Sequence, residues 1–322
     1  IKTMNAILTE KLERAKNIVL LGHVRPDGDC VGSVLALYLY LKKTAPSKQV
    51  TVCLEKPLEK FNYLSGFSEI VTDADAVSAP DLAVALDVSD KGRLGGFQRL
   101  FDDAKDTLNI DHHITNPHFA ATTICEPEAS STCELLYTLL DSDQVDEPIA
   151  AALYTGIVTD SGVFKYGSTS ARTMRIAGEL MEKGIPFGEI IDGAFYRKTF
   201  VQNQIMGLAL LHAVENADKT VIYSIVTEEE QRRLGTVHAD LDGISEQLRL
   251  TAGVKCAVLC SEMEPGSWKL SLRSLEPVDV AAIAMRYGGG GHIRAAGCTI
   301  VGKRAEEIME EVVRAAEAQL HV

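Results

Sequence analysis

The 322-residue chain lacks any apolar run long enough to cross a bilayer, and its N-terminus lacks a basic segment followed by an apolar one. We therefore expect a cytoplasmic protein without a membrane partner. Cysteine pairs with CxxC spacing are also absent, and the seven cysteines are scattered and odd in number. This pattern argues against both a disulfide framework and a zinc site, and it favours reduced, mostly buried thiols.

Positive charge is scarce in this chain. It has 32 Lys and Arg against 45 Asp and Glu, which gives a formal net charge of −13. A protein that coats long nucleic acid needs many cationic contacts with phosphates, so the composition argues against that function. A small anionic substrate held at one local site is still compatible with it. Site carboxylates whose charge a bound cation offsets can account for part of the negative charge.

Segments typical of strands and helices alternate in the first half of the chain. Such alternation is characteristic of βαβ crossovers and predicts an α/β domain with a mainly parallel sheet flanked by helices. Apolar runs predict strands at 18–22, 50–54, 82–87 and 107–110, and helical periodicity predicts helices at 31–43, 132–140 and 149–159.

A second α/β domain is predicted beyond a more polar helical segment at 186–215. We expect two domains, 1–185 and 216–322, joined by that helical linker, with the active-site cleft between them. The second domain should be the smaller one, with a mixed sheet. Its predicted strands are 221–226, 256–261 and 269–273, and its predicted helices are 278–287 and 304–319.

Carboxylates and histidines gather where the predicted elements of the first domain end. GHVRPDGDC, ALDVSD and NIDHHITN each accompany the end of a strand, and YTGIVTDSG ends a helix. In an open parallel sheet, sites collect at the carboxyl ends of the strands, so three of these four clusters point to one edge. The candidate residues are His23, Asp27, Asp29, Asp87, Asp111, His112, His113 and Asp160.

Each of these groups has an ordinary structural interpretation when it is taken alone. An aspartate at a helix start, such as Asp27 or Asp29, is usually an N-cap. Asp87 at a strand end is more often a turn residue, and the pair His112 and His113 could belong to a solvated loop. Four such clusters at element ends are poorly explained by independent turns. Their joint occurrence therefore favours a common site.

The chemistry that uses such a set of residues is two-metal catalysis. Clustered carboxylates repel one another, whereas divalent cations favour their ionised forms. Mixed imidazole and carboxylate ligands suit manganese or a similar ion. Two such ions can activate a water molecule and stabilise the leaving oxygen of a phosphoester.

The order of the motifs resembles that of a known superfamily. GHVRPDGDCVGS, LDVSD, IDHH and GIVTDSGVFKYGST are similar to the successive motifs of the DHH phosphoesterases. In the second half, LSLRS followed by VDVAAIAMRYGGGGHIRAAGCTI resembles the DHHA1 domain. The resemblance covers nearly the whole chain and is strongest to the NrnA-type subgroup of bifunctional oligoribonucleases and 3′-phosphoadenosine 5′-phosphate (pAp) phosphatases.

The resemblance implies two metal sites, with manganese as the expected ion, that share one carboxylate. Asp87 would bridge the two ions, and a water or hydroxide between them would be the nucleophile. The remaining ligands would be His23 and Asp27 for one ion, and Asp29, His112 and Asp160 for the other.

The resemblance also implies roles close to the reaction itself. His113 would lie near the scissile phosphate, where it could stabilise developing charge or assist proton transfer. Together with the ligands Asp87 and Asp160 it completes the implied catalytic set. Asp111 would orient a histidine through its other ring nitrogen.

A run of four glycines marks the second domain. Because glycine has no Cβ atom, the backbone N–H groups of this run can approach a phosphate closely. A glycine run alone is more often a flexible loop, but here a histidine flanks it and a strand carrying arginine precedes it, which favours an anion site. The predicted substrate-binding residues are Arg273, Ser274, Gly288, Gly289, Gly290, Gly291, His292 and Arg294.

The resemblance implies hydrolysis of short oligoribonucleotides, including the dinucleotide pApA, to mononucleotides, and of pAp to AMP. An enzyme that cleaves cyclic di-AMP or linear dinucleotides is the alternative within the same chemistry. A manganese pyrophosphatase shares the N-terminal motifs, but its C-terminal domain lacks GGGGH, which disfavours that function for this chain. A nucleotide-binding sensor without turnover is the alternative of a different class, which the complete ligand set disfavours. The sequence is compatible with a homodimer.

Overall fold

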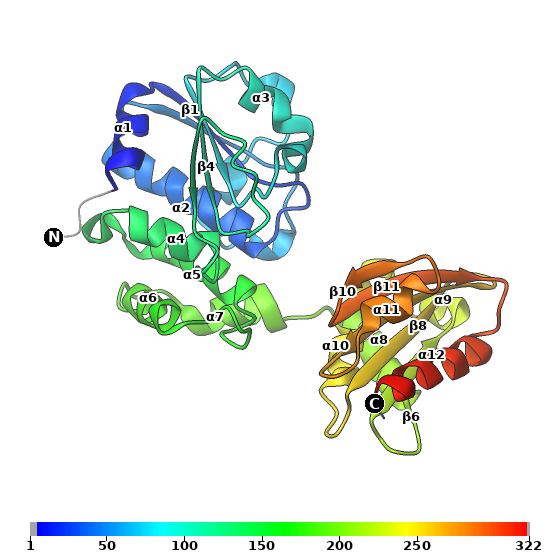
Figure 1. Cartoon of the computed structure of the whole chain (residues 1–322). Coiled ribbons are helices and arrows are strands. Elements are labelled where there is room, and N and C mark those ends of the chain that lie inside the picture. The colour runs from blue at the N-terminus through cyan, green and yellow to red at the C-terminus, as the bar shows by residue number, and fades with distance from the viewer. Residues whose placement is uncertain (1–4, 321–322) are drawn as a thin grey trace. The chain divides into compact units, whose positions relative to one another are not determined.

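The computed structural model describes residues 5–320, which form two compact units (Figure 1). The first unit ends at Arg197 and the second begins at Lys198. The segment 186–215 is therefore divided between them. Helix α7 (Phe187–Ile191) belongs to the first unit and α8 (Phe200–Leu211) to the second. No helix among residues 5–320 is both long enough and apolar enough to cross a membrane.

The first unit contains the predicted parallel sheet. All of its strand pairs are parallel, in the order β2-β1-β3-β4-β5. Four of the strands confirm the apolar runs. The fifth, β5, was not predicted because its residues are only half-buried and alternate too little to stand out. The strands are β1 (Asn17–Leu21), β2 (Gln49–Cys53), β3 (Leu82–Leu86), β4 (Asp106–Asp111) and β5 (Thr122–Cys125).

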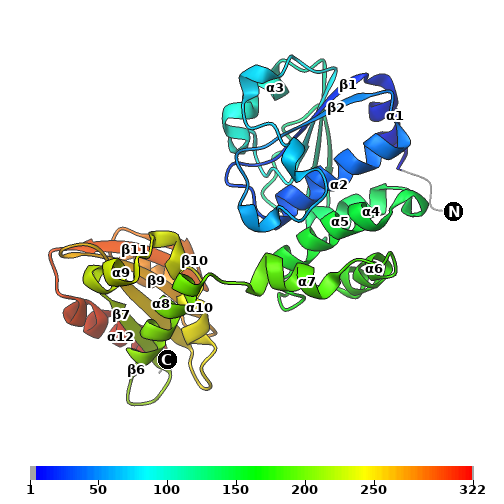
Figure 2. The same cartoon turned by 180° about the vertical axis from the view of Figure 1, so that it is seen from behind.

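Helices cover both faces of this sheet, which explains why β3 is apolar throughout and β1 is apolar after its first residue. Alternate residues such as Ile18 and Leu20 pack against α2, α4 and α5, while Val19 and Leu21 pack on the side of α3. Figures 1 and 2 show α2, α4 and α5 together at one side of the sheet. The helices are α1 (Ala6–Arg14), α2 (Gly28–Thr44), α3 (Gln98–Asp102), α4 (Thr132–Leu139), α5 (Glu147–Asp160) and α6 (Ala171–Met181).

The second unit is built on a mixed sheet in the order β10-β11-β9-β8-β7-β6. Only β7 and β8 pair in parallel. Helices α11 and α12 pack on one face, and α8 and α10 pack on the other. Its strands are β6 (Val214–Glu215), β7 (Val221–Val226), β8 (Cys256–Glu264), β9 (Ser267–Ser274), β10 (Gly290–His292) and β11 (Ala295–Val301), and its further helices are α9 (Glu228–Leu234), α10 (Ile244–Arg249), α11 (Val280–Met285) and α12 (Ala305–Leu320).

Candidate metal centre

The structure brings the predicted histidines and aspartates of the first unit together at the carboxyl edge of its sheet. Asp87 directly follows β3, Asp111 ends β4, and Asp160 is the last residue of α5. Three overlapping groups have potential ligand atoms within 4.8 Å of one another. These groups are His23 with Cys30 and Asp87, Asp87 with His112 and His113, and Asp29 with His112 and Asp160.

Asp87 lies at the centre of the cluster. Its side chain is 3 % exposed, its Oδ2 lies 3.4 Å from Nε2 of His23, and its Oδ1 lies 3.8 Å from both Nε2 of His112 and Nδ1 of His113. Its backbone is left-handed, with φ at 58°, a conformation that costs free energy for a residue with a side chain. Such strain is typical of functional sites, and here it directs one carboxylate toward three imidazoles.

Asp27 caps a helix and also lies beside an imidazole of the cluster. It is the N-cap of α2, because its Oδ1 accepts hydrogen bonds from the N–H groups of Asp29 and Cys30, each at 3.1 Å. The same oxygen lies 3.6 Å from Nε2 of His23. The helix cap therefore holds the carboxylate in place beside an imidazole.

Asp29 is wholly buried and faces a different helix. Its Oδ2 accepts from the N–H of Thr132 at 2.6 Å, and its Oδ1 accepts from the N–H of Cys133 at 2.9 Å. His112 places Nε2 4.0 Å from Oδ2 of Asp29 and 3.1 Å from Oδ2 of Asp160. Asp29 therefore does not cap α2, the helix to which it belongs. It joins the start of α4 to the imidazole at the end of β4.

A buried hydrogen-bond network fixes His113. Asp111 is fully buried, and its Oδ1 lies 2.7 Å from Nδ1 of His113. Its Oδ2 accepts from Asn116 at 2.5 Å, and Asn116 also donates to Asn109 at 2.7 Å. Because these bonds outweigh the opposing effect of burial, the pKa of Asp111 is lowered. Sequence reasoning missed both asparagines, since only the fold brings them behind the DHH segment.

The electrostatics of the cluster depart from those of free side chains. Burial raises the pKa values of Asp29 and Asp87, since it disfavours their charged forms. Burial alone would lower the pKa of His23, but hydrogen bonds to Asp27 and Asp87 outweigh it and raise that pKa to about 10. Carboxylates and imidazoles gathered this closely are donors that divalent cations take, so the set fits such ions.

The predicted substrate-binding residues of the second unit lie around β9, β10 and β11. The glycine run is more ordered than a loop, because Gly290 and Gly291 lie in β10 and pair with β11. A Cβ atom on Gly289 would lie 2.3 Å from the carbonyl oxygen of Gly297, so glycine is needed there for backbone packing. Gly288 has φ at 73°, which favours glycine for its conformation.

The polar side chains of this region differ in exposure. His292 is exposed, and the half-buried Arg273 donates one hydrogen bond to the carbonyl oxygen of Leu272 at 2.9 Å. Arg294 lies 3.3 Å from Glu276 and donates to the carbonyl oxygen of Val278 at 2.8 Å. The buried Ser274 hydroxyl donates to the same carbonyl oxygen at 2.6 Å.

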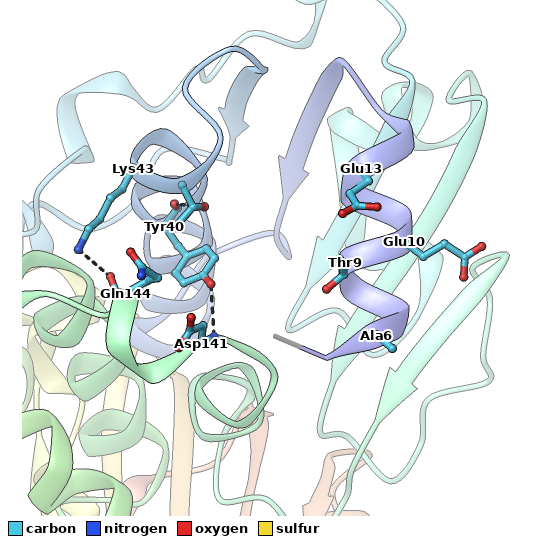
Figure 3. Close-up of a pocket in the computed structure, with 9 residues that line it drawn as sticks. Ala6, Thr9, Glu10, Glu13, Tyr40, Lys43, Asp141 and Gln144 are labelled. Atoms are coloured by element: carbon cyan, nitrogen blue, oxygen red, sulfur yellow. Dashed lines mark hydrogen bonds between the residues drawn. The ribbon is translucent and has the colours of Figure 1, made fainter. Parts of the chain in front are cut away.

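Grooves and hollows of the first unit lie both at the cluster and away from it. A groove of about 900 Å³ between α1 and the end of α2 is lined by Glu10, Glu13, Tyr40 and Lys43 among others (Figure 3). None of the predicted site residues lines it. Two hollows of about 270 Å³ each include Asp27 in one case and His23 in the other. The smaller hollows are therefore the ones relevant to the cluster.

Comparisons with known proteins agree with the fold and its two domains. Residues 17–157 match the DHH family, N-terminal domain, and residues 218–321 match the DHHA1 domain. Two proteins named bifunctional oligoribonuclease and PAP phosphatase NrnA are similar over most of their length. The protein of Thermus thermophilus is 29% identical, and the match covers 94% of this chain and 90% of the relative. The protein of Mycoplasma genitalium is 30% identical, and the match covers 92% of this chain and 93% of the relative. A crystal structure of an exopolyphosphatase-related protein from Bacteroides fragilis is 26% identical, with a TM-score of 0.85 over 98% of this chain and 97% of that chain.

A parallel sheet with clustered carboxylates and imidazoles at its edge, followed by a DHHA1 domain, defines a hydrolase of phosphoester bonds. The chain belongs to the DHH/DHHA1 phosphoesterases and, within them, to the NrnA-type group.

Proposed function

We propose that this protein hydrolyses short oligoribonucleotides, such as the dinucleotide pApA, to mononucleotides and converts pAp to AMP, with two divalent cations and manganese as the preferred ion. The observation that carries the proposal is the shared position of Asp87. One of its oxygens faces His23 and the other faces His112. The names of the NrnA relatives support the choice of substrates.

The ligand sets follow from the two sides of Asp87. On one side, His23 lies near both Asp27 and Asp87; on the other, His112 lies near Asp29, Asp87 and Asp160. The ions would supply an activated water and would neutralise charge on the leaving oxygen. We assign His23, Asp27 and Asp87 to one ion, and Asp29, Asp87, His112 and Asp160 to the other.

His113 is assigned to the substrate rather than to an ion. Its Nδ1 is engaged by Asp111, and 42 % of its side chain is exposed. The bond to Asp111 fixes the ring and raises the pKa of His113, so the ring can present a proton at Nε2 to a phosphate oxygen.

The second unit is assigned to the nucleotide. Arg273 and Arg294 carry the planar donors that phosphate oxygens prefer, and His292 lies exposed beside Gly291 in β10. We retain Ser274 and the glycine run in this set; the buried hydroxyl of Ser274 would act by holding the turn at Val278. A local anion site of this kind agrees with the acidic chain, because it needs few cationic residues.

A substrate panel tests the proposal. Purified protein with manganese is incubated with pAp, pApA, a short RNA, cyclic di-AMP and pyrophosphate, and products are separated by chromatography. We expect turnover of pAp, pApA and the short RNA. Cyclic di-AMP as the best substrate would move the protein to the cyclic dinucleotide phosphodiesterases. Nucleotide binding with no turnover of any substrate would favour a sensor and refute the proposal.

A further inference from the structure

Helix α4 begins against the carboxylates of the cluster. Its first residue, Thr132, is wholly buried and contacts two of them. The N–H of Thr132 donates to Oδ2 of Asp29 at 2.6 Å, and its hydroxyl donates to Oδ1 of Asp87 at 3.1 Å. The N–H of Cys133 donates to the other oxygen of Asp29 at 2.9 Å. A single residue therefore joins the two carboxylates, although the chain separates them by more than fifty positions.

The first turn of α4 is also held in place by bonds outside the cluster. Ser131 is its N-cap and accepts a hydrogen bond from the N–H of Glu134 at 3.0 Å. The buried carboxylate of Glu134 in turn accepts from Arg172 at 2.6 Å and from Thr173 at 2.7 Å. The position of Thr132 at the start of α4 is therefore set in part by residues outside the cluster and does not depend on a bound ion.

We propose that Thr132 is a positioning residue that orients Asp29 and Asp87 for the two cations. The inference rests on the proposed function, because it concerns the same metal centre. The Thr132 hydroxyl takes one acceptor site on Oδ1 of Asp87, and it leaves Oδ2 facing His23. A carboxylate shared by two ions must keep a single orientation, since rotation that suits one ion displaces it from the other.

Hydrogen bonds to metal ligands typically change metal affinity or activity about 10–100-fold when they are removed. Thr132→Val removes the hydroxyl and keeps the size, the β-branch and the backbone N–H of the residue. We therefore expect Thr132→Val to weaken manganese binding by about 10–100-fold. Thr132→Ser retains the hydroxyl and should bind manganese within about threefold of the wild-type chain, because the donor to Asp87 is restored.

Thr173→Val is the matched control. Thr173 is also wholly buried and donates its hydroxyl to a carboxylate, but that carboxylate is Glu134 and not a residue of the cluster. Thr173→Val should lower thermal stability and leave manganese affinity within about threefold. Glu134 keeps its bonds from Ser130 and Arg172 in this variant, Ser131 still caps α4, and the ligands keep their donors.

The experiment is manganese titration of the full chain by isothermal calorimetry, with thermal unfolding measured in a chelator to confirm that each variant folds. Weaker binding by Thr132→Val, rescue by Thr132→Ser and normal binding by Thr173→Val would support the inference. Should Thr132→Val fail to fold, Thr132→Ala replaces it with the same expected result. Equal affinity of Thr132→Val and the wild-type chain, no rescue by serine, or equal weakening by Thr173→Val would overturn it. Absence of manganese binding by the wild-type chain would overturn the proposed metal centre, and this inference with it.

Discussion

Gly156 is the position at which a small change should disturb the metal centre most directly. It lies in α5, and a Cβ atom there would lie 2.3 Å from Sγ of Cys133 and 2.5 Å from Oδ1 of Asp29. Ordinary contacts between such atoms are about 3.5–4 Å, so Gly156→Ala must push α5 and α4 apart or displace the carboxylate. Cys133 and Asp29 are both wholly buried, so neither side chain can move away into solvent.

The expected magnitude follows from two opposing contributions. Alanine stabilises a helix interior by about 1 kcal/mol relative to glycine. Overpacking of a dense core typically costs about 1–3 kcal/mol, and the overlap at Gly156 belongs at the upper end of that range. We expect a net loss of about 2 kcal/mol, which corresponds to a fall in Tm of roughly 4–8 °C for a domain of this size.

Gly178→Ala provides a control with the same substitution and the opposite expected change in stability. Gly178 lies in α6, is exposed, and has nothing within 4 Å of the added Cβ. Alanine should stabilise the chain there by about 0.5–1 kcal/mol. Calorimetric unfolding in a chelator measures both variants. The single tryptophan, Trp268, lies in the second unit, so its fluorescence reports a transition that neither change should move.

A Tm for Gly156→Ala equal to or above that of the wild-type chain would refute the packing of α4 and α5 against Asp29. A fall in Tm with unchanged manganese affinity would show that Asp29 retains its place and is not displaced by the added carbon.

Three further predictions concern the site residues. The raised pKa of His23 keeps it protonated at about pH 7 in the ion-free chain, whereas an imidazole must be neutral to bind a metal. Manganese affinity should therefore rise about tenfold per pH unit for each proton released. Calorimetry in buffers of different ionisation enthalpy measures that proton release, and the absence of any release would contradict the assignment of His23 as a ligand. His113→Gln should lower kcat about 10²–10⁴-fold with manganese affinity retained, whereas lost binding would make His113 a ligand. His292→Ala should raise KM for pAp more than it lowers kcat, and the reverse would place His292 in the chemical step.

The strands and the cluster at their ends could be predicted because each depends on a local pattern. The run 82–86 is apolar at every position, since helices cover both faces of the sheet. Asp87, Asp111 and the adjacent histidines follow such runs directly, so the parallel arrangement alone brings them to one edge.

The residues that support the ligands could not be predicted in the same way. Thr132 begins a helix with an ordinary capping pattern, Ser131 followed by Glu134, and nothing in that pattern shows which carboxylate its N–H groups will face. Asn116 likewise looks like a turn residue until the fold places it against Asp111. Such partners depend on contacts between distant segments, which periodicity does not encode.

The second unit likewise contains elements that the sequence predicts and elements that it does not. Its central strands β7, β8 and β9 were predicted from apolar content, but β10 was not, because Gly290 and Gly291 have no side chains to pack. The glycine run alone suggested a phosphate-binding backbone. The structure adds a packing requirement at Gly289, where β11 passes too close for a Cβ atom.

The central claim is that Asp87 serves both halves of one metal centre that hydrolyses short nucleotides. The most direct test compares the wild-type chain with Asp87→Ala in the hydrolysis of pAp and pApA, with manganese and with a chelator. The account predicts turnover by the wild-type chain in manganese, no turnover in the chelator, and loss of turnover of both substrates by the variant. Substantial turnover by a folded Asp87→Ala variant in manganese would contradict it.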